Sequence, residues 1–241
     1  SKRLGNAVDP FETLDKYGPD ATRWYMISNS NPWDNLKFDV SGIEEVRRKF
    51  FGTIHNIYSF FSLYSNIDGF DLNSKHVDYN DRHELDRWII SELNTLIKEV
   101  EEAYNNYEPT KSARLISNFV QDNLSNWYVR LSRRRFWKGE FNQDKISAYQ
   151  TLHECLSNIS IISSPISPFY MDNLYQDLNK NNGSVHLSNY PIYNENLVDK
   201  VLERKIRLSQ EICSLALSLR KKEKIKVRQP LPKILVPFKN A

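Results

Sequence analysis

The sequence contains little glycine, almost no cysteine and no long hydrophobic run. Only 7 of the 241 residues are glycine, whereas 12 are Phe, 13 are Tyr and 5 are Trp. β-rich folds with many tight turns usually use more glycine than this, so the composition favours helices. The two cysteines, Cys155 and Cys213, lie in stretches of apolar periodicity, with no second cysteine or histidine at metal-ligand spacing. We expect both to be reduced thiols in a hydrophobic core, and we expect no metal site.

No segment is apolar for long enough to span a bilayer, and the first six residues form no apolar signal region. We therefore expect a cytoplasmic protein with no membrane partner. With 40% hydrophobic and 26% charged residues, the chain can bury a substantial core without metals or disulfides. The formal net charge of +3 is too small to establish a nucleic-acid partner, so the distribution of the charges matters more than their sum.

Start signals and apolar periodicity predict a helical protein. Two short helices are expected between residues 9 and 28, the first opened by Asp9-Pro10 and ended by Gly18. Apolar residues at steps of three and four then predict a long helix that Ser41 opens. Further long helices are expected to begin at Asp81, where Glu84 completes a capping box, at Pro109, near Asn142 and near Glu195, with a shorter one over 169–178.

Three short segments are expected to be extended rather than helical. They are residues 184–187, 226–230 and 234–236. The last two have no obvious partner strands, so we expect them to begin a further domain. The sequence therefore predicts an all-α helical bundle with short β segments at its C-terminal end, divided into residues 1–40, 41–225 and 226–241.

A basic run near the end of the third long helix is the main candidate binding site. Its five cations occur within nine positions without an acidic neighbour: Arg130, Arg133, Arg134, Arg135 and Lys138. Helical spacing places Trp127, Arg130, Arg134 and Trp137 on one side, and cations beside aromatic rings suit RNA phosphates and unpaired bases. The alternative is that the arginines pair with acids on neighbouring helices. We expect Trp127 to be buried. The sequence leaves open whether Trp137, at the end of the helix, is buried or stacks on a base.

Other charged positions give weaker signals. Lys111 and Arg114, early in the same helix, are secondary candidates for the RNA face. Between residues 220 and 233, seven cations outnumber the single acid Glu223, and such a run is usually a solvated surface. As a phosphate contact it would add salt-sensitive affinity that does not depend on base sequence. The five histidines show neither metal spacing nor an arranged nucleophile.

Several short sequence motifs occur in a characteristic order. The N-terminal Ser1-Lys2-Arg3-Leu4-Gly5-Asn6, followed by Asp9-Pro10 and by Tyr17-Gly18-Pro19-Asp20-Ala21, resembles the end of the K-M-S-K-S signature and the next segment of class I aminoacyl-tRNA synthetases. Leu85-Asp86-Arg87-Trp88-Ile89 resembles the start of their anticodon-binding bundle. Asn126-Trp127-Tyr128-Val129-Arg130 and Ser132-Arg133-Arg134-Arg135-Phe136-Trp137 resemble the isoleucine enzymes of this class.

The resemblance implies a division of roles along the chain. Residues 1–40 would be the end of the catalytic core with helices that contact the tRNA stem, and residues 41–225 would bind the anticodon. Lys2, flanked by Ser1 and Arg3, would stabilise the ATP phosphates. The leading Lys-Met of the signature is absent, and Arg3 stands where many bacterial relatives have Ser. Nothing resembles the H-I-G-H element or an editing domain, so we expect the fragment alone to be inactive.

The intact enzyme implied by this resemblance would be a monomer that attaches isoleucine to tRNA(Ile). It would use ATP and magnesium through isoleucyl-adenylate, and no cofactor is expected on the fragment itself. Two alternatives are kept. One is the same anticodon-binding bundle from a valine or leucine enzyme, which the Trp-Tyr-Val-Arg motif and the motif of three arginines disfavour. The other is a helical protein-interaction scaffold whose basic patch binds acidic partners.

Overall fold

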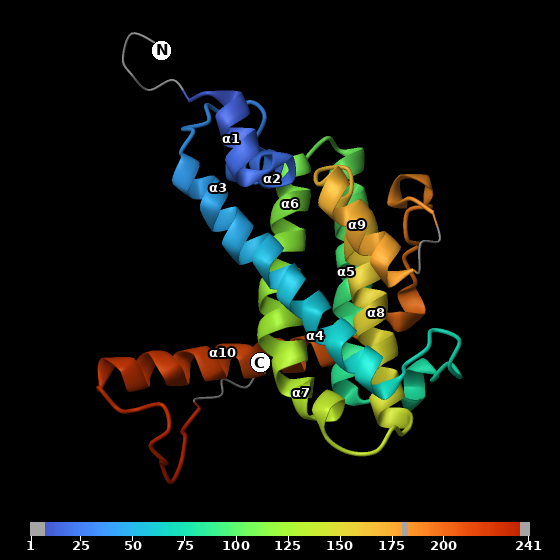
Figure 1. Cartoon of the computed structure of the whole chain (residues 1–241). Coiled ribbons are helices and arrows are strands. Elements are labelled where there is room, and N and C mark those ends of the chain that lie inside the picture. Colours follow the sequence, from blue (N-terminus) through green and yellow to red (C-terminus); the bar gives the residue numbers. More distant parts are fainter. Residues whose placement is uncertain (1–7, 180–182, 237–241) are drawn as a thin grey trace. The chain divides into compact units, whose positions relative to one another are not determined.

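The computed structural model describes residues 8–179 and 183–236, and over these ranges every regular element is a helix (Figure 1). The chain divides into two compact units, Ser1–Val198 and Asp199–Ala241. In chain order, the helices of the first unit are α1 (Pro10–Tyr17), α2 (Pro19–Asn29), α3 (Val40–Val46), η2 (Arg47–Phe51), α4 (Gly52–Asp68), η3 (Tyr79–Asp81), α5 (Glu84–Asn105), α6 (Pro109–Asn118), η4 (Phe119–Val129), α7 (Arg130–Trp137), α8 (Gln143–Ser163), α9 (Pro168–Leu178), η5 (Val185–Leu187) and η6 (Glu195–Leu197).

The two short N-terminal helices form as predicted. The Asp9 carboxylate accepts hydrogen bonds from the backbone N–H groups of Phe11 and Glu12, and Pro10 occupies the first turn of α1. Gly18 joins α1 to α2 with a φ of 84°, a conformation that glycine adopts without strain. Helix α2 packs against α3 and α6 and so fastens these helices to the bundle.

The long helix that was expected to open at Ser41 begins two residues earlier. Asp39 caps α3 because its carboxylate accepts a hydrogen bond from the backbone N–H of Ser41 at 2.9 Å. The π-helical turn η2 connects α3 to α4, and Gly69 ends α4 in the left-handed conformation. The expected helix is therefore correct, whereas its expected opening residue is wrong.

The helix expected to open at Asp81 also begins elsewhere. His83 is the N-cap of α5, and its Nδ1 accepts a hydrogen bond from the backbone N–H of Leu85 at 3.1 Å. Asp81 lies at the end of the 3₁₀ turn η3 instead, so the predicted capping box does not form. The predicted starts of α6 at Pro109 and of α8 next to Asn142 are correct.

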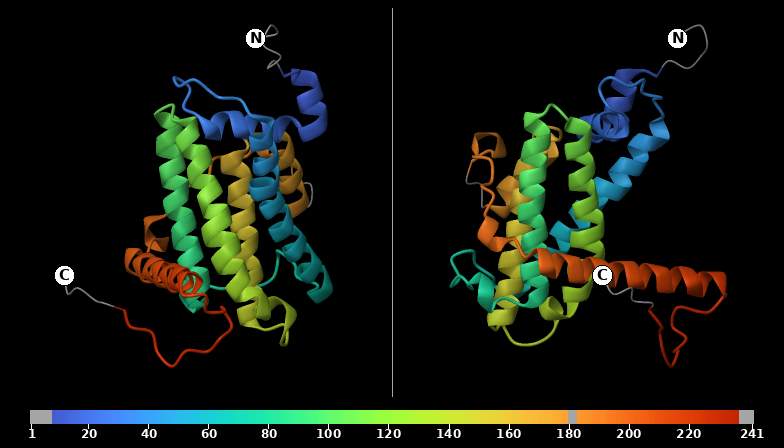
Figure 2. Two further views of the ribbon diagram at one scale, coloured as in Figure 1. Left: turned by 90° about the vertical axis from the view of Figure 1, so that its left-hand side faces the viewer. Right: turned by 180° about the vertical axis from the view of Figure 1, so that it is seen from behind.

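The core of the first unit lies between four long helical stretches. Helices α4, α5 and α8 and the continuous stretch α6–η4–α7 lie side by side in both views of Figure 2. Helices α5 and α8 bury the largest numbers of side chains, including Trp88 and Tyr149. At the end where α2 packs, Trp24 stacks on Phe50 with ring centroids 3.9 Å apart. Cys155 is buried in this core as predicted.

Residues 184–187 are not extended. Val185–Leu187 form the 3₁₀ turn η5, which Ser184 caps by accepting a hydrogen bond from the backbone N–H of His186. Asp172 of α9 accepts hydrogen bonds from the Ser184 hydroxyl and the Val185 N–H at 2.7 and 2.8 Å, so side-chain contacts fix this turn.

The second unit consists of helix α10 (Lys200–Lys222) and the segment that follows it. Asp199 caps α10 through the backbone N–H of Leu202. The strands predicted at 226–230 and 234–236 do not form: the described residues after α10 contain turns and bends only. A strand needs a partner for its backbone groups, and this segment has none. Cys213 on α10 is exposed, so its expected place in a core is wrong.

Candidate nucleic-acid interface

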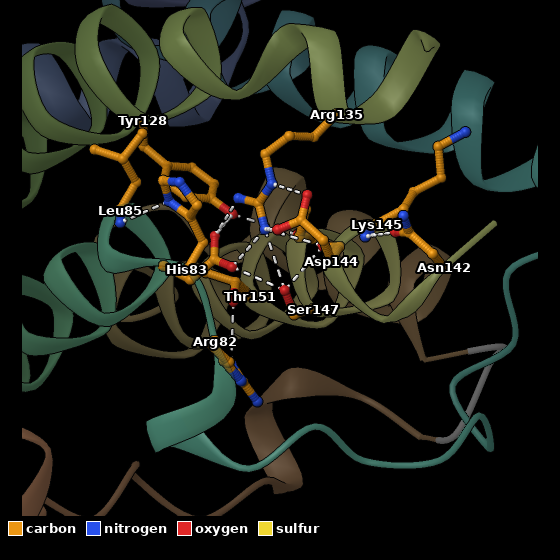
Figure 3. A network of polar contacts seen from close by, with 12 residues as sticks. Arg82, His83, Leu85, Tyr128, Arg135, Asn142, Asp144, Lys145, Ser147 and Thr151 are labelled. Atoms are coloured by element: carbon orange, nitrogen blue, oxygen red, sulfur yellow. Dashed lines mark hydrogen bonds and ion pairs between the residues drawn. The ribbon is translucent and has the colours of Figure 1, made fainter. Parts of the chain in front are cut away.

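The predicted basic run lies on helix α7, at the end of the bundle where α5 and α8 begin (Figure 3). Arg130, Arg133, Arg134 and Lys138 are all exposed, and Trp137 is 50% exposed. Phe136, between them in sequence, is fully buried and packs edge-on against Phe60 and Tyr149. This aromatic anchor holds α7 on the bundle while the cations point outward.

Arg135 does not share the exposure of its neighbours. Its Nη1 and Nη2 donate to the two carboxylate oxygens of Asp86, both at 2.7 Å, in the bidentate geometry that suits guanidinium and carboxylate groups. A second fork reaches Asp144, from Nε at 3.0 Å and from Nη2 at 2.8 Å. The Arg135 side chain is 13% exposed and that of Asp86 is 0% exposed. The prediction that Arg135 contacts RNA therefore conflicts with the structure, because two acids already occupy its donors.

Two further hydroxyl groups complete the network around Asp86. Tyr128 donates to Oδ1 at 2.7 Å, and Ser147 donates to Oδ2 at 2.9 Å (Figure 3). Burial and the Asp86 charge raise the pKa of Tyr128 well above its ordinary value, so its phenol remains a donor. Burial is the largest single influence on the pKa of Arg135 and lowers it, but the hydrogen bonds to Asp86 and Asp144 and the negative charge of Asp86 together raise that pKa overall. The network joins α5, η4, α7 and α8 at one end of the bundle.

A second ion pair, which is partly buried, lies near this end. Lys145 Nζ is 2.8 Å from Asp68 Oδ2, and Tyr149 donates to the same oxygen at 2.6 Å. Burial raises the pKa of Tyr149, and its hydrogen bond to Asp68 raises it further. Because Lys145 follows the N-cap of α8 and Asp68 ends α4, the pair ties these two helices together.

Arg114 also has an internal role. Its Nε donates to the Ser28 carbonyl at 2.9 Å and its Nη2 donates to the Asn29 carbonyl at 3.0 Å. These carbonyls belong to the last turn of α2, where cations compensate the helix dipole. Lys111 pairs with Glu108 at 3.3 Å on the surface. Arg114 is exposed and also fastens α2 to α6, so its expected contact with RNA stays a prediction.

Trp127 is only partly buried, whereas the next residue, Tyr128, is fully buried. The two rings lie three and four positions after Leu124, so helical spacing allows either of them to face inward. Tyr128 is the buried one, and its hydroxyl donates to Asp86, so the expectation that Trp127 is buried is only partly met. Asp86, Tyr128 and Ser147 were missed as site residues, and the signal that could have indicated them is an acid followed by apolar residues in Leu85-Asp86-Arg87-Trp88-Ile89.

No metal site is found in the described ranges. Among residues 8–179 and 183–236, no group of three or more His, Cys, Asp or Glu side chains could hold a metal ion. Within the same ranges, no helix has both the length and the apolar character needed to cross a membrane. Ser1, Lys2 and Arg3, the predicted ATP-binding residues, lie outside the described residues.

The chain is similar to known tRNA ligases along nearly its whole length. Isoleucine--tRNA ligase of Bacteroides fragilis is 61% identical over 242 residues, which cover 98% of this chain and 21% of that protein. The enzymes of Porphyromonas gingivalis and Clostridium tetani are 57% and 44% identical, and the aligned parts cover 98% and 99% of this chain and 21% and 23% of those proteins. The chain thus spans about a fifth of the length of the relatives it matches.

Among solved structures, the ternary complex of Agrobacterium radiobacter K84 agnB2 LeuRS-tRNA-LeuAMS contains a similar chain. The TM-score is 0.62 at 18% identity, and the match covers 83% of this chain and 22% of that chain. At this identity, the likeness shows the fold alone. The family described as the anticodon-binding domain of tRNA ligase matches residues 86–235, which is more than half of the sequence. The chain therefore belongs to the anticodon-binding domain family of tRNA ligases.

Proposed function

We propose that this chain is the part of an isoleucine--tRNA ligase that binds tRNA(Ile) and recognises its anticodon. The observation that carries this proposal is the 61% identity to an isoleucine--tRNA ligase over 98% of the chain. The relatives reported at 57% and 44% identity are isoleucine--tRNA ligases as well. The motif of three arginines, Arg133-Arg134-Arg135, remains the argument against a valine enzyme.

The exposed face of α7 is the proposed RNA contact. Arg130, Arg133, Arg134 and Lys138 would bind phosphates, because none of them is paired with an acid in the described structure. Trp137 has half of its surface free and would stack on an unpaired base. Phosphate contacts position the RNA, whereas hydrogen bonds to the edges of splayed bases, which stacking on Trp137 would hold in place, carry sequence information. Arg135 and Arg114 are not included in this set.

The intact protein would attach isoleucine to tRNA(Ile) with ATP and magnesium, through isoleucyl-adenylate. Ser1, Lys2 and Arg3 would lie near the ATP phosphates in that enzyme, as the sequence resemblance implies. The proposal includes a cytoplasmic location and a monomeric enzyme. The chain alone would bind RNA without catalysing aminoacylation.

Fluorescence anisotropy with two tRNAs tests the proposal. Labelled tRNA(Ile) and the same tRNA with an exchanged anticodon are titrated with the chain at two salt concentrations. We expect the native anticodon to bind more tightly at both, since base contacts depend less on salt than phosphate contacts do. If the two tRNAs bind with equal affinity and neither binds at the higher salt concentration, anticodon recognition is contradicted. In a second experiment, heparin competes with each tRNA for the chain. If heparin displaces both tRNAs equally easily, the protein-interaction scaffold is favoured.

Two substitutions separate the roles within this face. Arg134→Ala should weaken both tRNAs alike, whereas Trp137→Ala should reduce the difference between them. Lys98→Ala is the matched control, because Lys98 is an exposed cation on α5 outside the basic run. If neither Arg134→Ala nor Trp137→Ala differs from the control, then α7 is not the RNA contact.

A further inference from the structure

The two units of the chain carry net charges of opposite sign. Residues 199–241 contain 12 Lys and Arg against 4 Asp and Glu, a net charge of +8. Since the whole chain has a net charge of +3, residues 1–198 carry −5. The basic run of α7 therefore belongs to an acidic unit, and most of the excess positive charge lies in the other unit.

The C-terminal end of α10 forms a defined turn. The backbone N–H of Ile225 donates to the Arg220 carbonyl at 2.8 Å, and that of Lys224 donates to the Lys221 carbonyl at 3.2 Å. Lys224 has a φ of 54°, the left-handed conformation that closes this type of helix end. The chain thus reverses its direction within a few residues and does not continue as a helix.

Arg220 stabilises the segment that follows. Its Nη1 donates to the carbonyls of Lys226 and Gln229, both at 2.9 Å. Leu219, Ile225 and Leu231 line a common recess with the aliphatic part of Arg220. One of the seven cations between residues 220 and 233 is therefore used internally, since Arg220 holds the residues that follow it in a compact turn.

The remaining cations of this turn face solvent. They are Lys221, Lys222, Lys224, Lys226, Arg228 and Lys233, all exposed. No ion pair joins any of them to an acid in the described part of the chain. Repulsion among such cations is relieved when a polyanion binds them.

We propose that this turn, which we call the α10 turn (residues 220–233), is a second tRNA-binding surface that contacts the phosphate backbone. The inference rests on the proposed function, since it takes tRNA as the partner. Five of its six exposed cations are lysines, which act as point charges on flexible stems and bind phosphate without selecting a base. The match to the anticodon-binding family extends to residue 235 and so includes the α10 turn. This surface contributes affinity alone, whereas α7 contributes affinity through its cations and selectivity through Trp137.

The salt dependence of binding tests this assignment in the full chain. The triple variant Lys221→Gln, Lys222→Gln, Lys226→Gln keeps Arg220 and the left-handed Lys224. The control Arg204→Gln, Lys205→Gln, Arg207→Gln removes the same charge from exposed positions near the start of α10. Affinity for tRNA(Ile) and for the exchanged-anticodon tRNA is measured at several salt concentrations, and circular dichroism checks the fold of each variant.

For the first variant, we expect the slope of log affinity against log salt to fall by about two to three, while the ratio between the two tRNAs stays the same. The control should change the slope less. An unchanged slope, or equal changes in both variants, would overturn the α10 turn as a specific surface. If the first variant keeps the salt slope of RNA binding but loses affinity for an acidic protein, the α10 turn binds a protein partner instead.

The outcomes separate this inference from the proposed function. If the unmodified chain prefers the native anticodon and the slope does not change, only the α10 turn assignment fails. If the unmodified chain has no anticodon preference but the slope falls, only anticodon recognition fails. Absence of any tRNA binding by the unmodified chain would contradict both.

Discussion

At the scale of single residues, the carboxylate of Asp86 depends on three partners inside the bundle. Tyr128, Arg135 and Ser147 all donate to it at 2.7 to 2.9 Å. A buried carboxylate with this many donors is stable only while its partners remain, because the desolvation cost of the charge is offset by these bonds. Arg135 is the only cation among them.

We therefore expect Arg135→Ala to lower the free energy of unfolding by about 3–5 kcal/mol, since it leaves the Asp86 carboxylate buried without its cation. Urea denaturation measures the change. The neighbouring Arg134→Ala removes an exposed guanidinium and should stay within about 0.5 kcal/mol of the unmodified chain. Equal effects of the two substitutions would refute the internal role of Arg135.

His153 provides a prediction about pH. Burial lowers its pKa below the ordinary value of 6.5, and its Nε2 lies 3.2 Å from the Leu178 carbonyl. The unfolded chain therefore takes up this proton at a higher pH than the folded chain does. The stabilising contribution is complete above pH 6.5 and is lost as the pH falls through the lowered pKa of the folded state.

Replacing this histidine should remove that part of the pH dependence. The free energy of unfolding of His153→Gln, measured by urea denaturation from pH 7.5 downward, should fall less steeply below pH 6.5 than that of the unmodified chain. His76→Gln is the control because His76 is exposed. If both variants keep the slope of the unmodified chain, burial of His153 does not contribute to acid sensitivity.

At the scale of helices, Asp39 rather than Ser41 opens the long helix from α3 to α4. Asp39→Ala should lower the free energy of unfolding, because the Ser41 N–H loses its acceptor. Asp39→Asn should retain most of the stability. Ser41→Ala keeps this backbone bond and should cost less than Asp39→Ala, as thermal or urea unfolding can show. A larger loss for Ser41→Ala would restore the prediction made from the sequence.

Much of the helical order could be predicted from the sequence, because prolines, caps and apolar spacing are local signals. Pro10, Pro109 and Asn142 all marked helix starts correctly. The choice between Trp127 and Tyr128 could not be predicted in this way, since both fit the helical spacing and Tyr128 meets its partner Asp86, 42 positions away in the sequence, only in the folded bundle.

The candidate site was predicted only in part, for a related reason. A run of three arginines gives no information on which one finds an acid, because Asp86 lies 49 positions from Arg135 in the sequence and meets it only in the folded bundle. The absence of strands from the described residues after α10, which end at residue 236, has the same origin. Alternating residues favour a strand, but strand formation requires a partner that the local sequence cannot reveal.

At the scale of the whole molecule, the small net charge conceals two different units. The unit ending at Val198 is acidic and the unit beginning at Asp199 is basic, so the overall charge of +3 describes neither. Affinity for RNA therefore depends on where the cations are exposed. Measurements that change only the total charge of the chain would miss this division, whereas substitutions confined to α7 or to the α10 turn can detect it.

The two pairs of hydrogen bonds that Arg135 donates, to Asp86 and to Asp144, also have a consequence for how sequences of this family should vary. If Arg133 and Arg134 contact phosphates as proposed, positions 133 and 134 need only a positive charge, so lysine should be tolerated there. Position 135 needs a planar guanidinium that reaches acids at 86 and 144 at once, which lysine cannot supply. In a saturation library selected for function, lysine should thus be accepted at the first two arginines and rejected at the third, and changes at 86 should survive only together with changes at 135.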